Sequence, residues 1–77
     1  MASDAPHWVE VAARVRAEMA RANLKVTEMM GVLHLARPTA YRLFHGQRPY
    51  DLQQLDLLAA WLGVDVEVLI GTRETAP

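Results

Sequence analysis

The residues best suited to chemistry lie together between positions 29 and 50. This stretch holds three arginines and two histidines and contains no acidic residue. If residues 37–45 form a helix, at about 100° per residue, they separate into two faces. One face is apolar and suited to docking on a core, with Ala40, Leu43 and Phe44. The other face carries Arg37, Pro38, Tyr41, Arg42 and His45.

Reading a DNA major groove requires a short helix of this kind, fixed along one side and presenting polar side chains on the other. A guanidinium group can bond the guanine edge with two parallel donors. A merely solvated arginine face is the simpler alternative. The apolar backing and the absence of acids favour DNA contact.

Enzymatic chemistry finds little support. His7, His34 and His45 lack the spacing of metal ligands, the chain has no cysteine, and no carboxylate pair accompanies a histidine in a motif. The four glycines are scattered and form no phosphate-binding loop. We therefore expect no catalytic residue, no metal, no cofactor and no small-molecule ligand.

Composition indicates one globular domain. The chain has 77 residues, of which 52% are hydrophobic and 22% charged. Neither a secretory segment nor an apolar run long enough for a membrane span is found, so we expect a cytoplasmic protein without membrane contact.

The charge is polarised along the chain. The net charge is -1, which alone argues mildly against nucleic acid. Residues 1–28 are balanced, residues 29–50 carry three arginines and no acid, and residues 51–77 carry five acids and one arginine. One face could therefore meet phosphates while another meets a partner or solvent.

Apolar periodicity predicts helices over residues 5–22, 26–33, 37–45 and 52–62, with a turn at 34–36. In the first, we expect Trp8 in the core and Glu18 on the solvent side. In the second and last, the predicted inward residues are Met29, Met30, Leu33, Leu52, Leu55, Leu58, Ala59 and Leu62.

Residues 64–70 admit two structures. Their alternating, β-branched residues are typical of a strand, which would have to pair with its copy in another subunit. We favour a short helix capped by Asp65, with Val66, Leu69 and Ile70 inward. Residues 71–77 are expected to form a disordered tail after a domain of residues 1–70.

From residue 25 to residue 70 the chain resembles the lambda-repressor-like helix-turn-helix family, also called the Cro/repressor or XRE type. The resemblance rests on the spacing of many positions together. These are Leu24, Met29, Met30, Leu33, Leu35, Ala40, Leu43, Gly46, Arg48, Pro49, Leu55, Leu58, Ala59, Leu62, Gly63, Val64, Leu69 and Ile70.

The resemblance implies a compact all-α, five-helix domain that regulates transcription in a bacterial cell as a phage-type repressor. It places residues 37–45 in the major groove of an operator, with Arg37 and Arg42 as base readers. Tyr41 and His45 would contact a base or a phosphate, and Gln47, Arg48 and Thr27 phosphates. The groove-facing positions are Arg37, Pro38, Thr39, Tyr41, Arg42 and His45.

A homodimer on DNA is also implied, because one such module reads only a few base pairs. The candidate contacts are the Leu57 and Trp61 surface, or residues 64–70 with Val66, Val68 and Ile70. Leu57 and Trp61 could equally be peripheral core.

Four positions depart from the family pattern. Lys25 stands where Ser or Thr usually caps a helix, Val26 where Gln is common, Met30 where a small residue is usual, and His34 where the turn usually has Gly. We expect Thr27 to supply the cap instead. These departures and the acidic C-terminal third also suit a second hypothesis, in which the chain has the same fold but is an antitoxin-like or anti-repressor module that binds a protein.

Overall fold

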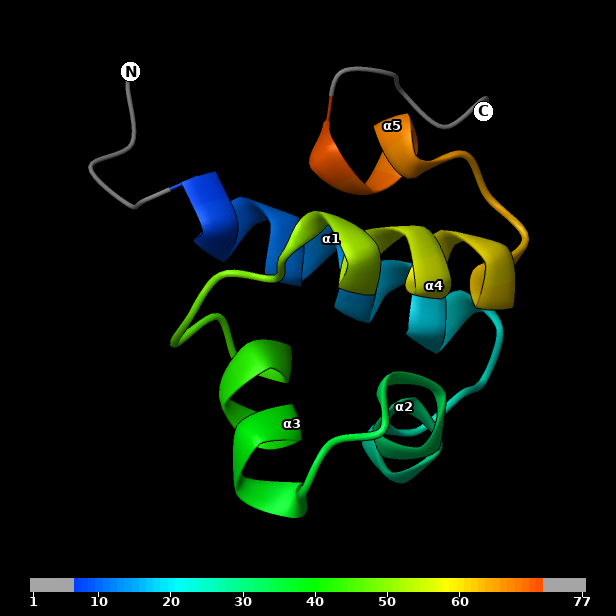
Figure 1. Ribbon diagram of the computed structural model, residues 1–77. Helices are drawn as coiled ribbons and strands as arrows, with labels where there is room; N and C mark the ends of the chain where they lie inside the picture. Colours follow the sequence, from blue (N-terminus) through cyan, green and yellow to red (C-terminus); the bar gives the residue numbers. More distant parts are fainter. Residues whose placement is uncertain (1–6, 72–77) are drawn as a thin grey trace.

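Helix α1 (His7–Arg21) is the longest helix and supports most of the others. The computed structural model describes residues 7–71. Helix α1 packs against α3, α4 and α5, while α2 packs against α3 and α4 (Figure 1). After α1 come α2 (Val26–Leu33), α3 (Arg37–Phe44), α4 (Leu52–Leu62) and α5 (Val66–Ile70).

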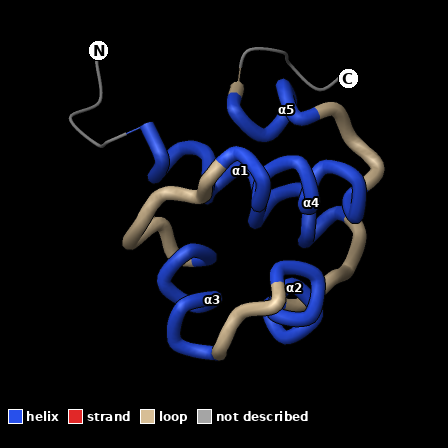
Figure 2. Tube along the Cα trace, viewed as in Figure 1, coloured by secondary structure: helices blue, strands red, loops and turns tan. Residues whose placement is uncertain are grey.

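The predicted all-α fold is confirmed over this part of the chain. Five helices and the turns between them account for residues 7–71, which contain no strand (Figure 2). The predicted helix boundaries agree with the observed ones to within a residue or two. The start predicted at residue 5 and most of the predicted tail at 71–77 lie outside the described residues.

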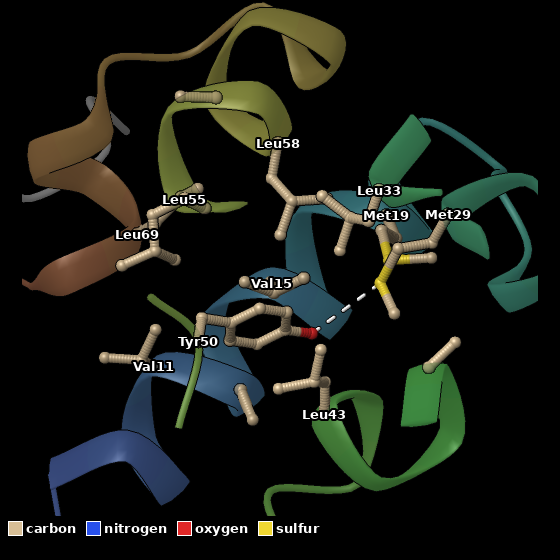
Figure 3. Close-up of a cluster of buried hydrophobic side chains, with 13 residues drawn as sticks. Val11, Val15, Met19, Met29, Leu33, Leu43, Tyr50, Leu55, Leu58 and Leu69 are labelled. Carbon is tan, nitrogen blue, oxygen red and sulfur yellow. Dashed lines mark hydrogen bonds between the residues drawn. The ribbon is translucent and has the colours of Figure 1, made fainter. Parts of the chain in front are cut away.

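The core is a single cluster in the middle of the bundle. Tyr50, from the loop between α3 and α4, points into this cluster beside Val15 and Leu43 (Figure 3). All five helices contribute to it, so each amphipathic stripe is covered by the others. Its largest fully buried side chains are Val15, Met19, Met29, Leu43, Leu58 and Leu69.

The helical alternative for residues 64–70 is correct. Asp65 is the N-cap residue of α5, and Gly71 ends the helix in the left-handed conformation with φ 84°. Leu69 is fully buried, and Val66 and Ile70 are partly buried against the core. Packing on α1 and α4 thus outweighs the weak strand preference of the β-branched residues.

Two apolar residues at helix starts are more exposed than predicted. Leu52 is 77% exposed, although periodicity places it on the inward stripe of α4. It is the first residue of that helix, whereas Leu55, one turn further along the same stripe, is buried. Trp8, the second residue of α1, is 39% exposed instead of lying in the core. Periodicity identifies a face but not how far along the helix its neighbours reach.

Glu18 lies on the buried side of α1, so the predicted solvent-facing position is wrong. It follows Val11 by seven residues and Val15 by three, which puts it on the buried side of α1. Its exposure is only 8%. Its carboxylate lies 3.7 Å from Nη1 of Arg21, one turn further along the helix.

The predicted cap at Thr27 is also wrong. The N-cap residue of α2 is Lys25, whose backbone N–H donates to Oε1 of Glu28 at 3.0 Å. This is the half of a capping box that needs no Ser or Thr. A complete capping box starts α4, where Asp51 Oδ1 accepts from the Gln54 backbone at 2.7 Å and Gln54 Oε1 accepts from the Asp51 backbone at 2.9 Å.

Candidate nucleic-acid interface

Helix α3 is docked along one side only. Ala40 and Leu43 are fully buried, and Phe44 packs partly against the core. On the other side Arg37, Pro38, Arg42 and His45 are exposed, and Thr39 and Tyr41 are half-buried. The two faces predicted from the sequence are therefore confirmed.

The turn between α2 and α3 depends on an unusual conformation at His34. This residue has φ 55°, in the left-handed region where glycine is favoured. Its backbone N–H, and that of Leu35 at 3.1 Å, both donate to the Met30 carbonyl, which closes α2. His34 therefore closes α2 in a conformation that glycine adopts more readily.

Three side chains on the exposed side of α3 lie in a row. The guanidinium carbon of Arg37 is 5.7 Å from the centre of the Tyr41 ring, and the Tyr41 and His45 ring centres are 6.1 Å apart. Their i,i+4 spacing produces this row. His45 also meets Phe44 edge-on, with ring centres 5.2 Å apart. Arg37, Tyr41 and His45 therefore lie next to one another along the polar face of α3.

The arginines of this face are free to meet an anionic ligand. Within residues 7–71 the ion pairs are Arg14 with Glu10 and Arg21 with Glu18, both inside α1. None involves Arg37, Arg42 or Arg48, and α3 itself contains no acid. The helix start at Ala36 also has no side-chain cap, so the first amide groups of α3 can donate to a phosphate.

The loop after α3 holds the other predicted phosphate contacts. Gln47 and Arg48 are both exposed, and the Gln47 backbone N–H donates to the Arg42 carbonyl at 2.9 Å. Gly46 has φ 76°, and a Cβ on it would lie 3.4 Å from the Ala12 Cβ. The loop therefore passes close against α1. Thr27, at the start of α2, is exposed as well.

Tyr50 anchors the end of the same loop. Its hydroxyl donates to Sδ of Met29 on α2 at 3.6 Å (Figure 3). Burial raises the pKa of the Tyr50 hydroxyl above its usual value, and the positive charge of Arg16 opposes that rise only in part. The loop from Gly46 to Tyr50 is thus held at both ends by core contacts.

One residue of this region was missed from the sequence. Arg16, on α1, donates from Nη1 to the Phe44 carbonyl at 2.6 Å, and its guanidinium carbon lies 6.0 Å from the centre of the Phe44 ring. The two residues are 28 positions apart, so no local pattern reveals the contact. Arg16 joins the first helix to the end of α3.

The candidate dimer contacts do not share one environment. Leu57, at 40%, is exposed, and Trp61 is half-buried one turn later on α4. Val66 and Val68 are half-buried. Ile70 instead lines a cleft of about 410 Å³. Its other lining residues are His7, Trp8, Val11, Pro49, Tyr50 and Leu55.

The described residues contain no group of three or more His, Cys, Asp or Glu side chains that could hold a metal ion. Of the helices between His7 and Gly71, none combines the length and apolarity needed to cross a bilayer.

Comparison of the chain with protein-family models, curated proteins and solved structures gave no match.

Proposed function

We propose that the chain is a sequence-specific duplex-DNA-binding transcriptional regulator of the phage repressor or Cro type. The observation that carries the proposal is α3, anchored by Ala40 and Leu43, with an acid-free face of unpaired arginines on its other side. This helix would enter the major groove of an operator in a bacterial cytoplasm.

The arginines divide by position. Arg37 and Arg42 project from the exposed side of α3 and would bond base edges, most naturally guanine. Arg48 and Gln47 lie beyond the end of the helix, and Thr27 lies at the start of α2. These three would bond phosphates and fix the register of the protein on the duplex. Tyr41 and His45, held in a row with Arg37, would contact a base or a phosphate.

Binding as a homodimer would extend the recognised site. Leu57 is the exposed residue among the candidate contacts, and half-buried Trp61 lies one turn further along α4. Two copies related by two-fold symmetry would read inverted half-sites about one helical turn apart. Occupation of such an operator would block or recruit RNA polymerase.

The deciding experiment is selection of bound duplexes from a random DNA pool at about physiological salt, where non-specific phosphate attraction is partly suppressed. Enrichment of inverted half-sites would support both DNA reading and the dimer. Enrichment of a single half-site would support DNA reading by a monomer. A folded protein that enriches no sequence would contradict the proposal.

A protein-interaction module is the second candidate. Leu52 and Leu57 are exposed apolar residues on α4, and residues 51–77 carry most of the acids. Both features suit an antitoxin-like or anti-repressor partner. Tight binding to a protein without any affinity for DNA would favour this function, whereas a steep salt dependence on duplex DNA would count against it.

A further inference from the structure

The C-terminal end of α3 leaves one carbonyl that the following turn does not use. The backbone amide of His45 donates to the Tyr41 carbonyl, that of Gly46 to the Leu43 carbonyl and that of Gln47 to the Arg42 carbonyl. The Phe44 carbonyl accepts instead from the guanidinium of Arg16, at 2.6 Å. Since the last carbonyls of a helix have no partner within it, Arg16 supplies one from another helix.

This contact is stronger than an ordinary side-chain hydrogen bond. The donor is charged, the bond is partly buried, and the acceptor lies at the negative end of the α3 dipole. The guanidinium also lies 6.0 Å from the centre of the Phe44 ring, close enough for a cation–π contribution. Among the hydrogen bonds of residues 7–71, no other side-chain bond joins α3 to a neighbouring helix.

The two ends of α3 are therefore fixed by different means. The turn at His34 ties the start of the helix to α2, and Arg16 ties its end to α1. Arg42 and His45 belong to the end that Arg16 holds. Base readout needs side chains placed to within about half an ångström, and this precision depends on the groups that support them.

We infer that Arg16 is a positioning residue for DNA reading: it holds the C-terminal end of α3 so that Arg42 meets a base edge and His45 a base or a phosphate. The inference rests on the proposed function. Arg16 belongs to α1 and is only half-exposed, so it acts through the helix and not as one of the base-reading side chains.

The test compares Arg16→Gln with Arg21→Gln, which removes the same charge from α1 at an exposed position five residues further along the helix. Affinities are measured on the selected duplex and on a random duplex over a range of salt concentrations. We expect Arg16→Gln to lower the affinity for the selected duplex roughly tenfold, which is the size of a lost base contact. On the random duplex, its loss of affinity should be as small as that of Arg21→Gln.

Two further variants separate positioning from folding. Arg16→Lys keeps the charge and should retain folding and random-duplex affinity while still losing several-fold on the selected duplex. Combining Arg16→Gln with Arg42→Ala should cost less than the product of the single losses, because Arg16 acts through the end of the helix that carries Arg42.

The outcomes distinguish the two proposals. If the wild-type chain selects no duplex, the proposed function fails and this inference with it. If the wild type selects a duplex, equal losses on both duplexes, with a salt slope reduced by about one, would identify Arg16 as a phosphate contact and overturn the inference. The inference would also be overturned if the loss of affinity in the double variant equalled the product of the losses for Arg16→Gln and Arg42→Ala.

Discussion

The hydroxyl of Tyr50 donates to the sulfur of Met29 at 3.6 Å inside the core, and this bond joins the loop after α3 to α2. Thioether sulfur is a weak acceptor, so the bond stabilises the fold modestly. Its position matters more than its strength, because it fixes the end of the loop that carries Gln47 and Arg48.

The buried Tyr50 predicts a loss of stability in alkali. Burial raises the pKa of its hydroxyl above the usual value of about 10. Below pH 10 both states keep the proton, and this group adds no pH dependence. Above pH 10 the unfolded chain releases the proton while the native chain retains it, so the free energy of unfolding should fall by up to about 1.4 kcal/mol per pH unit.

Chemical denaturation between pH 8 and 11 would measure this fall. Tyr50→Phe should lose less than about 1 kcal/mol at neutral pH, the value of a weak hydrogen bond, and should show a shallower alkaline decline. Tyr41→Phe is the control, and its free energy of unfolding should fall with pH as that of the wild type does. An identical decline in all three proteins would contradict the role given to Tyr50.

His34→Gly should stabilise the protein by about 0.5–1 kcal/mol. The left-handed conformation at His34 costs a side-chain-bearing residue about 1–2 kcal/mol, of which the greater freedom of glycine in the unfolded chain returns part. Thermal unfolding of the two proteins checks this. A lower melting temperature in the glycine variant would show that the imidazole makes a stabilising contact of its own.

Gly46→Ala and Gly63→Ala should each cost about 1 kcal/mol of stability. Both glycines have positive φ, at 76° and 73°, so a side chain strains the backbone at either position. A Cβ at Gly46 would make ordinary van der Waals contact with α1, at 3.4 Å from the Ala12 Cβ and 3.5 Å from the Val9 Cα, and one at Gly63 meets no atom within 4 Å. Space therefore adds no penalty at either position. Urea unfolding measures both losses, and a much larger loss for Gly46→Ala would show that α1 leaves no room for the added methyl group.

Arg42→Ala and Arg48→Ala should have different effects on DNA binding. On the selected duplex Arg42→Ala should cost about 1–3 kcal/mol and relax the preference at one base position, because it removes a base contact. Arg48→Ala should weaken binding to all sequences alike and reduce the salt slope by about one. Titrations on selected and random duplexes separate the two effects. Equal loss on both duplexes for Arg42→Ala would refute base reading by this side chain.

Much of the fold could be predicted because the helices and their buried faces follow from the local periodicity of apolar residues. The stripes of α1, α2 and α3, the glycine after α4 and the polar face of α3 all follow from spacings of three and four residues. The errors arose where burial depends on the rest of the molecule. Leu52 lies on the predicted apolar stripe of α4 but is exposed at the start of the helix. Glu18 is a charged residue within the otherwise apolar stripe of α1, so a search for apolar residues alone does not include it.

Long-range contacts were beyond sequence reasoning for a different reason. Arg16 looked like one of several balancing charges in the first 28 residues, and nothing near it indicates Phe44. The Tyr50 to Met29 bond spans 21 positions and was equally invisible. In both cases the partner is a backbone carbonyl or a thioether, groups that leave no compositional signal.

The two ends of the bundle meet. Nε2 of His7, the first residue of α1, lies 3.1 Å from the carbonyl of Ile70, the last residue of α5. A short linker in place of residues 72–77 and 1–6 could therefore close the backbone into a ring. Reopening that ring at the exposed Gly63 would give a circular permutant with the same helix packing. Retention of the native helix content and stability in this permutant would show that the arrangement of the five helices does not depend on their order along the chain.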